Sequence, residues 1–259
     1  IATENKNFED AVTLITKALE VNPQHSAAYI HLGDALRHLN LYDLALSCYD
    51  CASTLQPQSS AAYNNKSLLL KDLCRFQEAL ASINESIRLN PNLSLTHSNK
   101  ALILKNMGQW EEAIQSCKMA IRLMPNNVMA HHNLGMIQKE LAQISDAIAS
   151  YDRALELDPD FHEAKWNKSL TLLLNGQLKE GFELFEWRFK AQTGQAPIEI
   201  DAPLWLGAQD VPGKTVLLHS EQGLGDCIQF CRYAPLLKAR GAKVLLVVPK
   251  AMEIGRAHV

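Results

Sequence analysis

The sequence lacks several features that would place it in a specialised class of protein. No apolar run approaches the ~18 residues that a membrane span needs. Basic side chains are not in excess, with 25 Lys and Arg against 28 Asp and Glu, so little charge is available to neutralise the phosphates of nucleic acid. The hydrophobic fraction, 47% of 259 residues, is too high for a disordered chain. We therefore expect a folded protein with neither a membrane span nor a nucleic-acid partner.

The six cysteines do not form a metal-binding pattern. Cys48 and Cys51 are three residues apart and Cys227 and Cys231 are four apart, on segments that we expect to be helical. No second pair or histidine cluster lies at the spacing of a zinc site. We expect no metal site, and we interpret the cysteines as small core residues in a reducing compartment, which favours a cytoplasmic location.

Proline, which is rare elsewhere, recurs with a fixed period. Five of the ten prolines are separated by 34 residues, namely Pro23, Pro57, Pro91, Pro125 and Pro159. An alanine precedes each proline by twelve residues, at Ala11, Ala45, Ala79, Ala113 and Ala147. A bulkier residue lies between alanine and proline, at Ile15, Tyr49, Ile83, Cys117 and Tyr151. A period of this length indicates an array of repeated units.

Each unit divides into two amphipathic helices. In the unit 60–93 we expect one helix over about 63–74 and another over about 76–89. The pair ends at Pro91, because proline has no N–H to donate and its predecessor avoids the α region. Alanines mark the places where two helices approach closely. One pair cannot bury its apolar face alone, but stacked neighbours can.

This pattern resembles the tetratricopeptide repeat. The unit 26–59 matches the signature of that family at Tyr29, Leu32, Gly33, Ala45, Tyr49, Ala52 and Pro57. The unit 128–161 matches it at Leu134, Gly135, Ala147, Tyr151, Ala154 and Pro159. The middle units carry Lys66-Ser67 and Lys100-Ala101 in place of Leu-Gly. The resemblance implies a mainly α fold, a right-handed solenoid of helix pairs that binds other proteins.

We expect the array to occupy residues 1–195. It consists of a partial unit 1–25, full units 26–59, 60–93, 94–127 and 128–161, and a degenerate unit 162–195. In the degenerate unit Gly181 and Arg188 take the small positions, and no proline closes it. Terminal repeats are atypical because they must cover the stack or dock on something else. We predict that this last helix pair docks toward the next domain.

Two polar rows share the period of the repeat. Asparagine recurs on the first helix at Asn65, Asn99, Asn133 and Asn167, and a basic row follows at Arg37, Lys71, Lys105 and Lys139. Each asparagine either bonds the backbone of a neighbouring repeat or belongs to a track that clamps the backbone of an extended peptide. The asparagine ladder resembles the ladders in repeat superhelices of protein-modifying transferases and cargo adaptors. The basic row is either a solvated face or part of the same groove.

On the functional interpretation, the rows form a concave surface that binds a protein or peptide. Changing Asn99 and Asn133 together to Ala is then expected to weaken capture of the partner.

The composition changes after residue 195. Pro197, Pro203 and Pro212 interrupt a segment without helical period, so we expect a linker over 196–212, in which Trp205 is either an anchor or simply buried. Continuous apolar segments at 214–220 and 243–249 predict two buried strands. Between them, 226–240 has helical spacing, with an inner face of Ile228, Tyr233, Leu236 and Leu237. The order strand–loop–helix–strand indicates the truncated start of a Rossmann-like α/β sheet, over 213–252.

A glycine-bearing loop follows the first of these strands. Gly223, Leu224 and Gly225 lie where ligands bind in open α/β sheets, and glycine allows close approach of a ligand to the backbone. The third glycine of a dinucleotide fingerprint is replaced by Ile228, and no acidic residue follows the second strand at the expected distance, which argues against NAD. No Gly-Lys-Ser/Thr is present in this segment, so it is not a P-loop.

The segment Leu-Leu-His-Ser-Glu-Gln-Gly-Leu-Gly-Asp, which ends at Asp226, resembles the start of the glycosyltransferase family 9 domain of heptosyltransferases. The resemblance spans about 203–252 and implies a bacterial protein with a GT-B architecture of two Rossmann-like lobes. It makes Asp226 the candidate catalytic base and 223–225 the substrate-binding loop, with Gly223 where the family has serine or threonine. Aspartate at a helix start is also a good N-cap, which is the alternative role for Asp226.

The resemblance also implies a nucleotide-sugar donor for the full-length parent, bound mainly by a second lobe. We expect no cofactor in the present chain and no turnover by it alone. Two functions follow: a repeat array that recruits a protein acceptor or partner for an attached glycosyltransferase, or a non-catalytic scaffold that binds extended peptides.

Residues 253–259 match the translation of a common sequencing adapter, so we expect native sequence to end near Met252 of a chain that is a piece of a longer protein.

Overall fold

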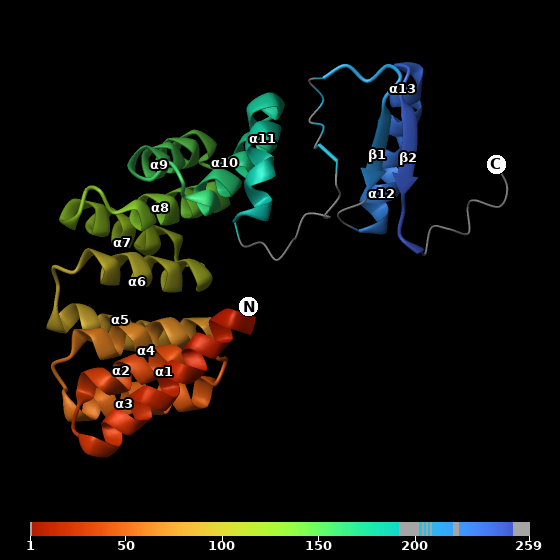
Figure 1. Cartoon of the computed structure of the whole chain (residues 1–259). Coiled ribbons are helices and arrows are strands. Elements are labelled where there is room, and N and C mark those ends of the chain that lie inside the picture. Colours follow the sequence, from red (N-terminus) through yellow and green to blue (C-terminus); the bar gives the residue numbers. More distant parts are fainter. Residues whose placement is uncertain are drawn as a thin grey trace. The chain divides into compact units, whose positions relative to one another are not determined.

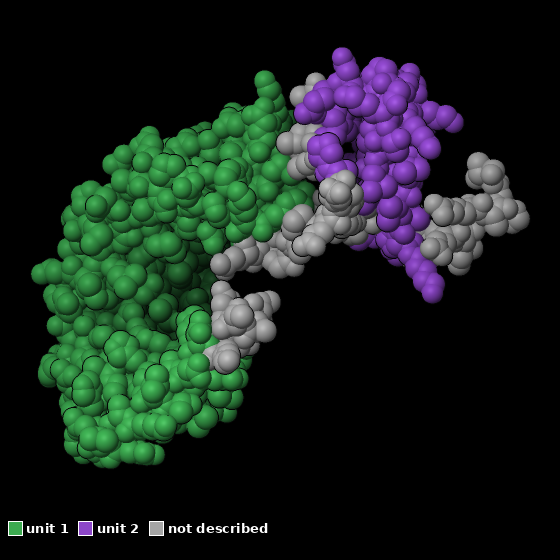
Figure 2. Space-filling view, in the orientation of Figure 1, with its two compact units in different colours: residues 1–197 green, residues 198–259 purple. Residues whose placement is uncertain are grey.

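The computed structural model describes residues 2–191, 202–203, 205, 207, 209–219 and 223–250, and the structural statements below concern these residues. The chain divides into two compact units, residues 1–197 and 198–259, which are described separately (Figure 2). Parts of the expected linker 196–212 and all of 253–259 lie outside the described residues.

The first unit is a stack of helix pairs that follow one another along the chain (Figure 1). It begins with α1 (Ala2–Val21) and continues with the pairs α2 (Ser26–His38) and α3 (Tyr42–Leu55), α4 (Ser60–Asp72) and α5 (Phe76–Leu89), α6 (Ser94–Asn106) and α7 (Trp110–Leu123), α8 (Val128–Glu140) and α9 (Ile144–Leu157), and α10 (His162–Leu174) and α11 (Leu178–Phe185). A 3₁₀ turn, η1 (Glu186–Phe189), follows α11. The mainly helical fold expected from the 34-residue period is confirmed.

Every turn inside a pair contains one residue in the left-handed region. These residues are Asn40, Cys74, Gly108, Ala142 and Gly176, spaced by 34 residues with φ between 57° and 77°. At the end of α2, the N–H of Asn40 donates to Arg37 and that of Leu41 donates to Leu36. This is the Schellman arrangement, which satisfies the last carbonyls of the helix. Backbone geometry therefore dictates the turn, although only two of the five positions hold glycine.

The repeated alanines are fully buried between the helices of each pair. Ala45, Ala79, Ala113 and Ala147 expose no surface, and neither do the bulkier residues Tyr49, Ile83, Cys117 and Tyr151 four positions later. Gly33 and Gly135 lie against the rings of Tyr49 and Tyr151, where an added Cβ would approach a ring carbon to 2.6 or 2.7 Å. The middle units have Ser67 and Ala101 at this position, opposite the smaller Ile83 and Cys117. Side-chain volume is thus matched across each helix pair.

The first helices of the pairs form the inner side of the curved stack. In the described residues α2 contacts α4, α4 contacts α6, α6 contacts α8 and α8 contacts α10, whereas successive second helices approach one another far less. Closer approach on one side bends a stack toward that side. Figure 2 shows that the first unit is hollowed on one side. The residues that α2, α4, α6, α8 and α10 turn away from their partners therefore line a concave surface.

The second unit contains a parallel pair of strands. β1 (Thr215–His219) pairs with β2 (Lys243–Val247), with Thr215 opposite Lys243. Between them run α12 (Leu224–Phe230), the 3₁₀ turn η2 (Cys231–Tyr233) and α13 (Ala234–Ala239) (Figure 1). Val211, Val216, Leu237 and Ala242 form its core, with Trp205 packed against them. The two expected strands and the α/β character are confirmed. The strands are not the buried ones that the apolar segments predicted, because Leu217, Leu245 and Val247 are 37%, 47% and 48% exposed.

One expectation for this unit is wrong. The segment 226–240 is not a single helix with one inner face, because η2 separates α12 from α13. Pro235 lies in the first turn of α13, where its missing N–H removes no bond within the helix. The helical period is lost at this break. Ile228 and Leu236 are consequently 61% and 59% exposed, Tyr233 is exposed as well, and only Leu237 of the four is buried.

Candidate peptide-binding surface

Three rows of side chains run across the first helices, at positions related by i, i+4 and i+7 and therefore on one helix face. The first row is buried and polar: Asn64, Ser98 and His132. The second, which we call the apolar row, is half-buried and consists of Leu68, Leu102, Met136 and Leu170. The third, the basic row, consists of Arg37, Lys71, Lys105 and Lys139, all half-buried.

The asparagine ladder bonds each unit to the one before it. Asn99 Nδ2 donates to Asn64 Oδ1 (2.9 Å), Asn133 Nδ2 to Ser98 Oγ (3.0 Å), and Asn167 Nδ2 faces His132 Nε2 (3.0 Å). Asn99 and Asn133 are only 8% and 1% exposed. Their contacts are those of the structural alternative, although most partners are side chains and not backbone. An amide in this position bonds adjacent units together and exposes little surface to a peptide.

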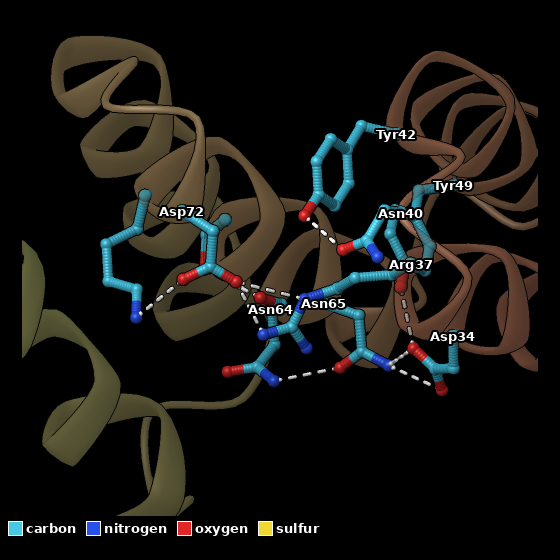
Figure 3. Close-up of polar contacts among 10 residues, drawn as sticks. Asp34, Arg37, Asn40, Tyr42, Tyr49, Asn64, Asn65 and Asp72 are labelled. Carbon is cyan, nitrogen blue, oxygen red and sulfur yellow. Dashed lines mark hydrogen bonds and ion pairs between the residues drawn. The ribbon is translucent and has the colours of Figure 1, made fainter. Parts of the chain in front are cut away.

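The ladder begins differently at Asn65, which is half-buried. Its Nδ2 donates to Asp34 Oδ1 and Oδ2 at 2.9 and 3.2 Å, and the Tyr49 hydroxyl donates to the same Asp34 Oδ1 at 2.7 Å (Figure 3). Asn64 Nδ2 in turn donates to Asn65 Oδ1 at 3.0 Å. Asp34 therefore holds the first two full units together through one shared carboxylate.

The first two members of the basic row share a carboxylate. Arg37 Nη2 and Nε donate to Asp72 Oδ2 at 2.6 and 3.1 Å, and Lys71 Nζ lies 2.9 Å from Asp72 Oδ1 (Figure 3). Burial alone would raise the pKa of Asp72, but the hydrogen bonds from Lys71 and Arg37 outweigh it and hold that pKa below its usual value. Asp72 therefore remains charged and neutralises part of the row at this end.

Lys105 is the centre of the positive charge. In the described part of the chain it forms no ion pair, whereas Lys139 lies 3.2 Å from Glu140. Burial is the largest influence and lowers the pKa of Lys105. The negative charge of Glu140 is second and opposes this shift, and the positive charges of Lys139 and Lys71 lower the pKa further. Lys105 thus experiences the field of both neighbours in the row. An anion placed beside Lys105 would relieve this repulsion.

His132 lies next to this centre but adds no charge at neutral pH. Burial, and secondarily the charge of Lys105, lower its pKa to about 4. Because the Asn167 amide donates to Nε2, the proton of the neutral ring is assigned to Nδ1, which is buried without a hydrogen-bond partner in the described residues. His132 therefore adds nothing at neutral pH to the positive charge of the basic row.

The expected substrate-binding loop lies at the carboxyl end of β1. Gly223 is the N-cap of α12, and Leu224, Gly225 and Asp226 form its first turn, so the helix begins two residues earlier than expected. The N-cap role for Asp226 is therefore wrong, because Gly223 already occupies that position. A Cβ at Gly223 or Gly225 would meet nothing within 4 Å in the described residues. The side chain of Asp226 lies outside the described residues.

Sequence reasoning missed the apolar row. Its signal was present, because Leu68, Leu102, Met136 and Leu170 also recur every 34 residues. Large apolar side chains on a repeat are normally attributed to the core, and only the structure places these four on the inner surface.

Among the described helices none is long and apolar enough to cross a membrane. No group of three metal-binding side chains comes together in the described part of the chain.

Comparison with known proteins identifies the repeat. Models described as tetratricopeptide repeat match residues 2–60, 60–93, 94–127 and 128–161. Protein FlbA of Caulobacter vibrioides is 35% identical over 77 residues, which are 29% of this chain and 13% of FlbA. The chain thus spans only a small part of the length of that relative.

Solved structures show the same fold at low identity. The protein TTC0263 of Thermus thermophilus is 24% identical with a TM-score of 0.59, over 64% of this chain and 91% of that one. A chain of the APC/C hetero-tetramer Cut9–Hcn1 is 15% identical with a TM-score of 0.67, over 74% and 39%. MamA (41-end) from Desulfovibrio magneticus RS-1 is 16% identical with a TM-score of 0.54, over 66% and 97%. Identities this low support the fold and nothing finer.

Proposed function

Because the chain belongs to the tetratricopeptide repeat family, we propose that the inner surface of α2, α4, α6, α8 and α10 binds an extended segment of a partner protein. The observation that carries this proposal is the apolar row, four large side chains left half-buried at the same position of successive helices. Large apolar side chains that stay partly exposed at one position of successive units are the kind of surface that other proteins contact. The neighbouring basic row supplies the polar edge.

Within this surface, the ladder asparagines divide into two groups. Asn99 and Asn133 are buried and act by holding adjacent units in register. Asn65 and Asn167 are half-buried and remain candidates for contact with a peptide, as do the four basic side chains. A partner is therefore held by side chains of the apolar and basic rows, on a scaffold that the buried amides keep rigid.

The test is selection of peptides from a random dodecapeptide library displayed on phage, with the full 259-residue chain as bait. A Met136→Arg variant places a charge in the middle of the apolar row. The matched control, Gln115→Arg, places the same charge on the exposed face of α7. Selected peptides should bind the unmodified chain and the control but not Met136→Arg. Equal binding to both variants, with helical content retained, would overturn the proposal.

For the second unit, we propose that it begins the acceptor-binding lobe of a GT-B glycosyltransferase that uses a nucleotide-sugar donor in the full-length parent. The support is the sequence resemblance together with the position of 223–225, which follow β1 at its carboxyl end in a parallel pair. Asp226 would act as the base that deprotonates the acceptor hydroxyl. The array would then recruit the protein acceptor, or a partner, to this enzyme in the cytoplasm of a bacterium.

This second proposal is tested in a form of the protein that carries the second lobe. Transfer of sugar from a radiolabelled nucleotide-sugar to acceptor is measured for Asp226→Asn, with Asp210→Asn, an exposed carboxylate outside the loop, as the control. Loss of turnover only in Asp226→Asn supports the proposed base. Full turnover by Asp226→Asn would remove Asp226 from the mechanism. Absence of a nucleotide-sugar site in the adjoining sequence would favour the non-catalytic scaffold.

A further inference from the structure

From the spacing and charge of the inner surface we infer that the partner segment is a polyproline II helix that carries an acidic side chain at every third position. This inference rests on the proposed peptide-binding function and specifies the chemistry of the partner. It follows from three properties of the described residues. These are the spacing of the first helices, the ion pairing of the basic row, and the position of the apolar row beside the basic row on the same helix face.

The spacing of the rows selects the conformation of the peptide. The first helices of successive units contact each other, and helices that pack together typically have axes about 8–10 Å apart. A polyproline II helix advances about 3.1 Å per residue with three residues per turn, so that every third side chain returns to the same face after about 9.3 Å. A β-strand returns to the same face after two residues, or about 6.7 Å, which is too short, and then after about 13 Å, which is too long. Of these two extended conformations, the polyproline II helix matches the typical helix spacing more closely.

The charge of the rows selects acidic side chains. Arg37, Lys71, Lys105 and Lys139 present one cation per unit over four successive units. Asp72 already pairs with the first two and Glu140 with the last, whereas Lys105 has no ion pair in the described residues. A carboxylate opposite Lys105 gains an ion pair that the chain itself does not supply. The acidic position that faces Lys105 should therefore contribute most to affinity.

The apolar row selects the residue next to each acid. Leu68, Leu102 and Met136 each lie three residues before a lysine of the basic row on the same helix, and so on the adjacent part of the face. An apolar side chain beside each acidic one in the peptide would cover them. At α10 the basic position is taken by Leu173, so the acidic pattern ends there. The complementary motif is an acidic residue followed by an apolar one, repeated every three residues.

The experiment measures the binding of four fluorescein-labelled 15-residue peptides to the full chain by fluorescence anisotropy. The test peptide is (Glu-Leu-Pro)5, in which proline favours the polyproline II conformation. (Gln-Leu-Pro)5 removes the charge, (Lys-Leu-Pro)5 reverses it, and a reordered peptide of the same composition places the five glutamates together. Each is titrated against the unmodified chain, Lys105→Glu, Met136→Arg and the control Lys118→Glu, an exposed lysine on α7.

We expect (Glu-Leu-Pro)5 to bind at least roughly tenfold more tightly than the other three peptides, and Lys105→Glu to weaken it by roughly tenfold, a change of about 1.4 kcal/mol. Lys118→Glu should leave the affinity unchanged. If all four peptides bind alike and Met136→Arg abolishes their binding, the groove binds peptides but the acidic three-residue pattern is refuted. If no peptide depends on Met136 and phage selection also yields no groove-dependent binder, the proposed function and the inference both fail.

Discussion

Gly135 packs against the ring of Tyr151. Whether Gly135→Ala raises or lowers the free energy of unfolding should therefore depend on the residue at position 151. In Gly135→Ala the new Cβ would lie 2.7 to 3.0 Å from three carbons of the Tyr151 ring, against an ordinary separation of about 3.5–4.0 Å. Tyr151 is fully buried, so the ring has little room to move. Overpacking of this kind costs about 1–3 kcal/mol, while replacing glycine by alanine in a helix gains about 1 kcal/mol. The net expected effect is a loss of about 1 kcal/mol.

In a Tyr151→Cys background the same substitution should stabilise the protein. The ring is then absent, and alanine at position 135 facing cysteine at position 151 would reproduce the natural pair Ala101 and Cys117 of the preceding unit. Only the gain in helix propensity remains, about 1 kcal/mol. The double-mutant cycle should therefore show a coupling free energy of about 2 kcal/mol.

The assay is urea unfolding of the four proteins, followed by circular dichroism and by amide hydrogen exchange in α8 and α9. Local exchange is needed because repeat arrays do not always unfold in one step. Stabilisation by Gly135→Ala of similar size in both backgrounds would refute the steric argument.

Two further predictions concern buried polar groups of the inner helices. Asn133→Ala should lower the free energy of unfolding by about 1 kcal/mol, because it removes the hydrogen bond to the preceding unit. Peptide affinity should stay unchanged. Asn84→Ala, at an exposed position, is the control. Folded His132 has a pKa of about 4, below the usual value of 6.5, so the unfolded chain binds the proton first as the pH falls. The contribution of His132 to stability is therefore complete above pH 6.5. The free energy of unfolding should fall by up to about 3 kcal/mol as the pH drops toward 4. In thermal melts against pH, His132→Asn should lose this dependence and exposed His31→Gln should keep it.

The repeat was predictable from the sequence because its signals are local. The five prolines of the 34-residue period each follow the last helix of a unit, and small residues at the same period require close packing, so the helix pairs needed no knowledge of the stack. The left-handed turn residues were not predictable, because Cys74 and Ala142 have no intrinsic preference for that conformation. Closure of the helix pair imposes it on them.

The role of the asparagines depended on packing between units. A recurrent polar residue on a helix face has the same sequence signal whether it bonds a neighbouring helix or a ligand. The bonds of Asn99 to Asn64 and of Asn133 to Ser98 each join residues 35 positions apart, a contact that only the stacking geometry specifies. The burial of both amides favours the structural role, and the Asn133→Ala measurement tests it.

In the second unit, helical spacing over 226–240 suggested one continuous helix. Pro235 is compatible with that pattern when it falls in the first turn of a helix, and the sequence does not say whether the helix starts there or earlier. The break at η2 leaves Ile228 and Leu236 exposed on separate helices. The position of a proline relative to a helix start was therefore the missing information.

The central claim is that the inner surface of the first helices holds the partner segment. Its most direct test is photo-crosslinking of (Glu-Leu-Pro)5, with benzoylphenylalanine in place of the central leucine, followed by mass spectrometry of the digested chain. The account predicts crosslinks to α4, α6 and α8, concentrated near Leu102 and Met136. Crosslinks confined to the second helices, or to the exposed Phe182 of α11, would contradict it.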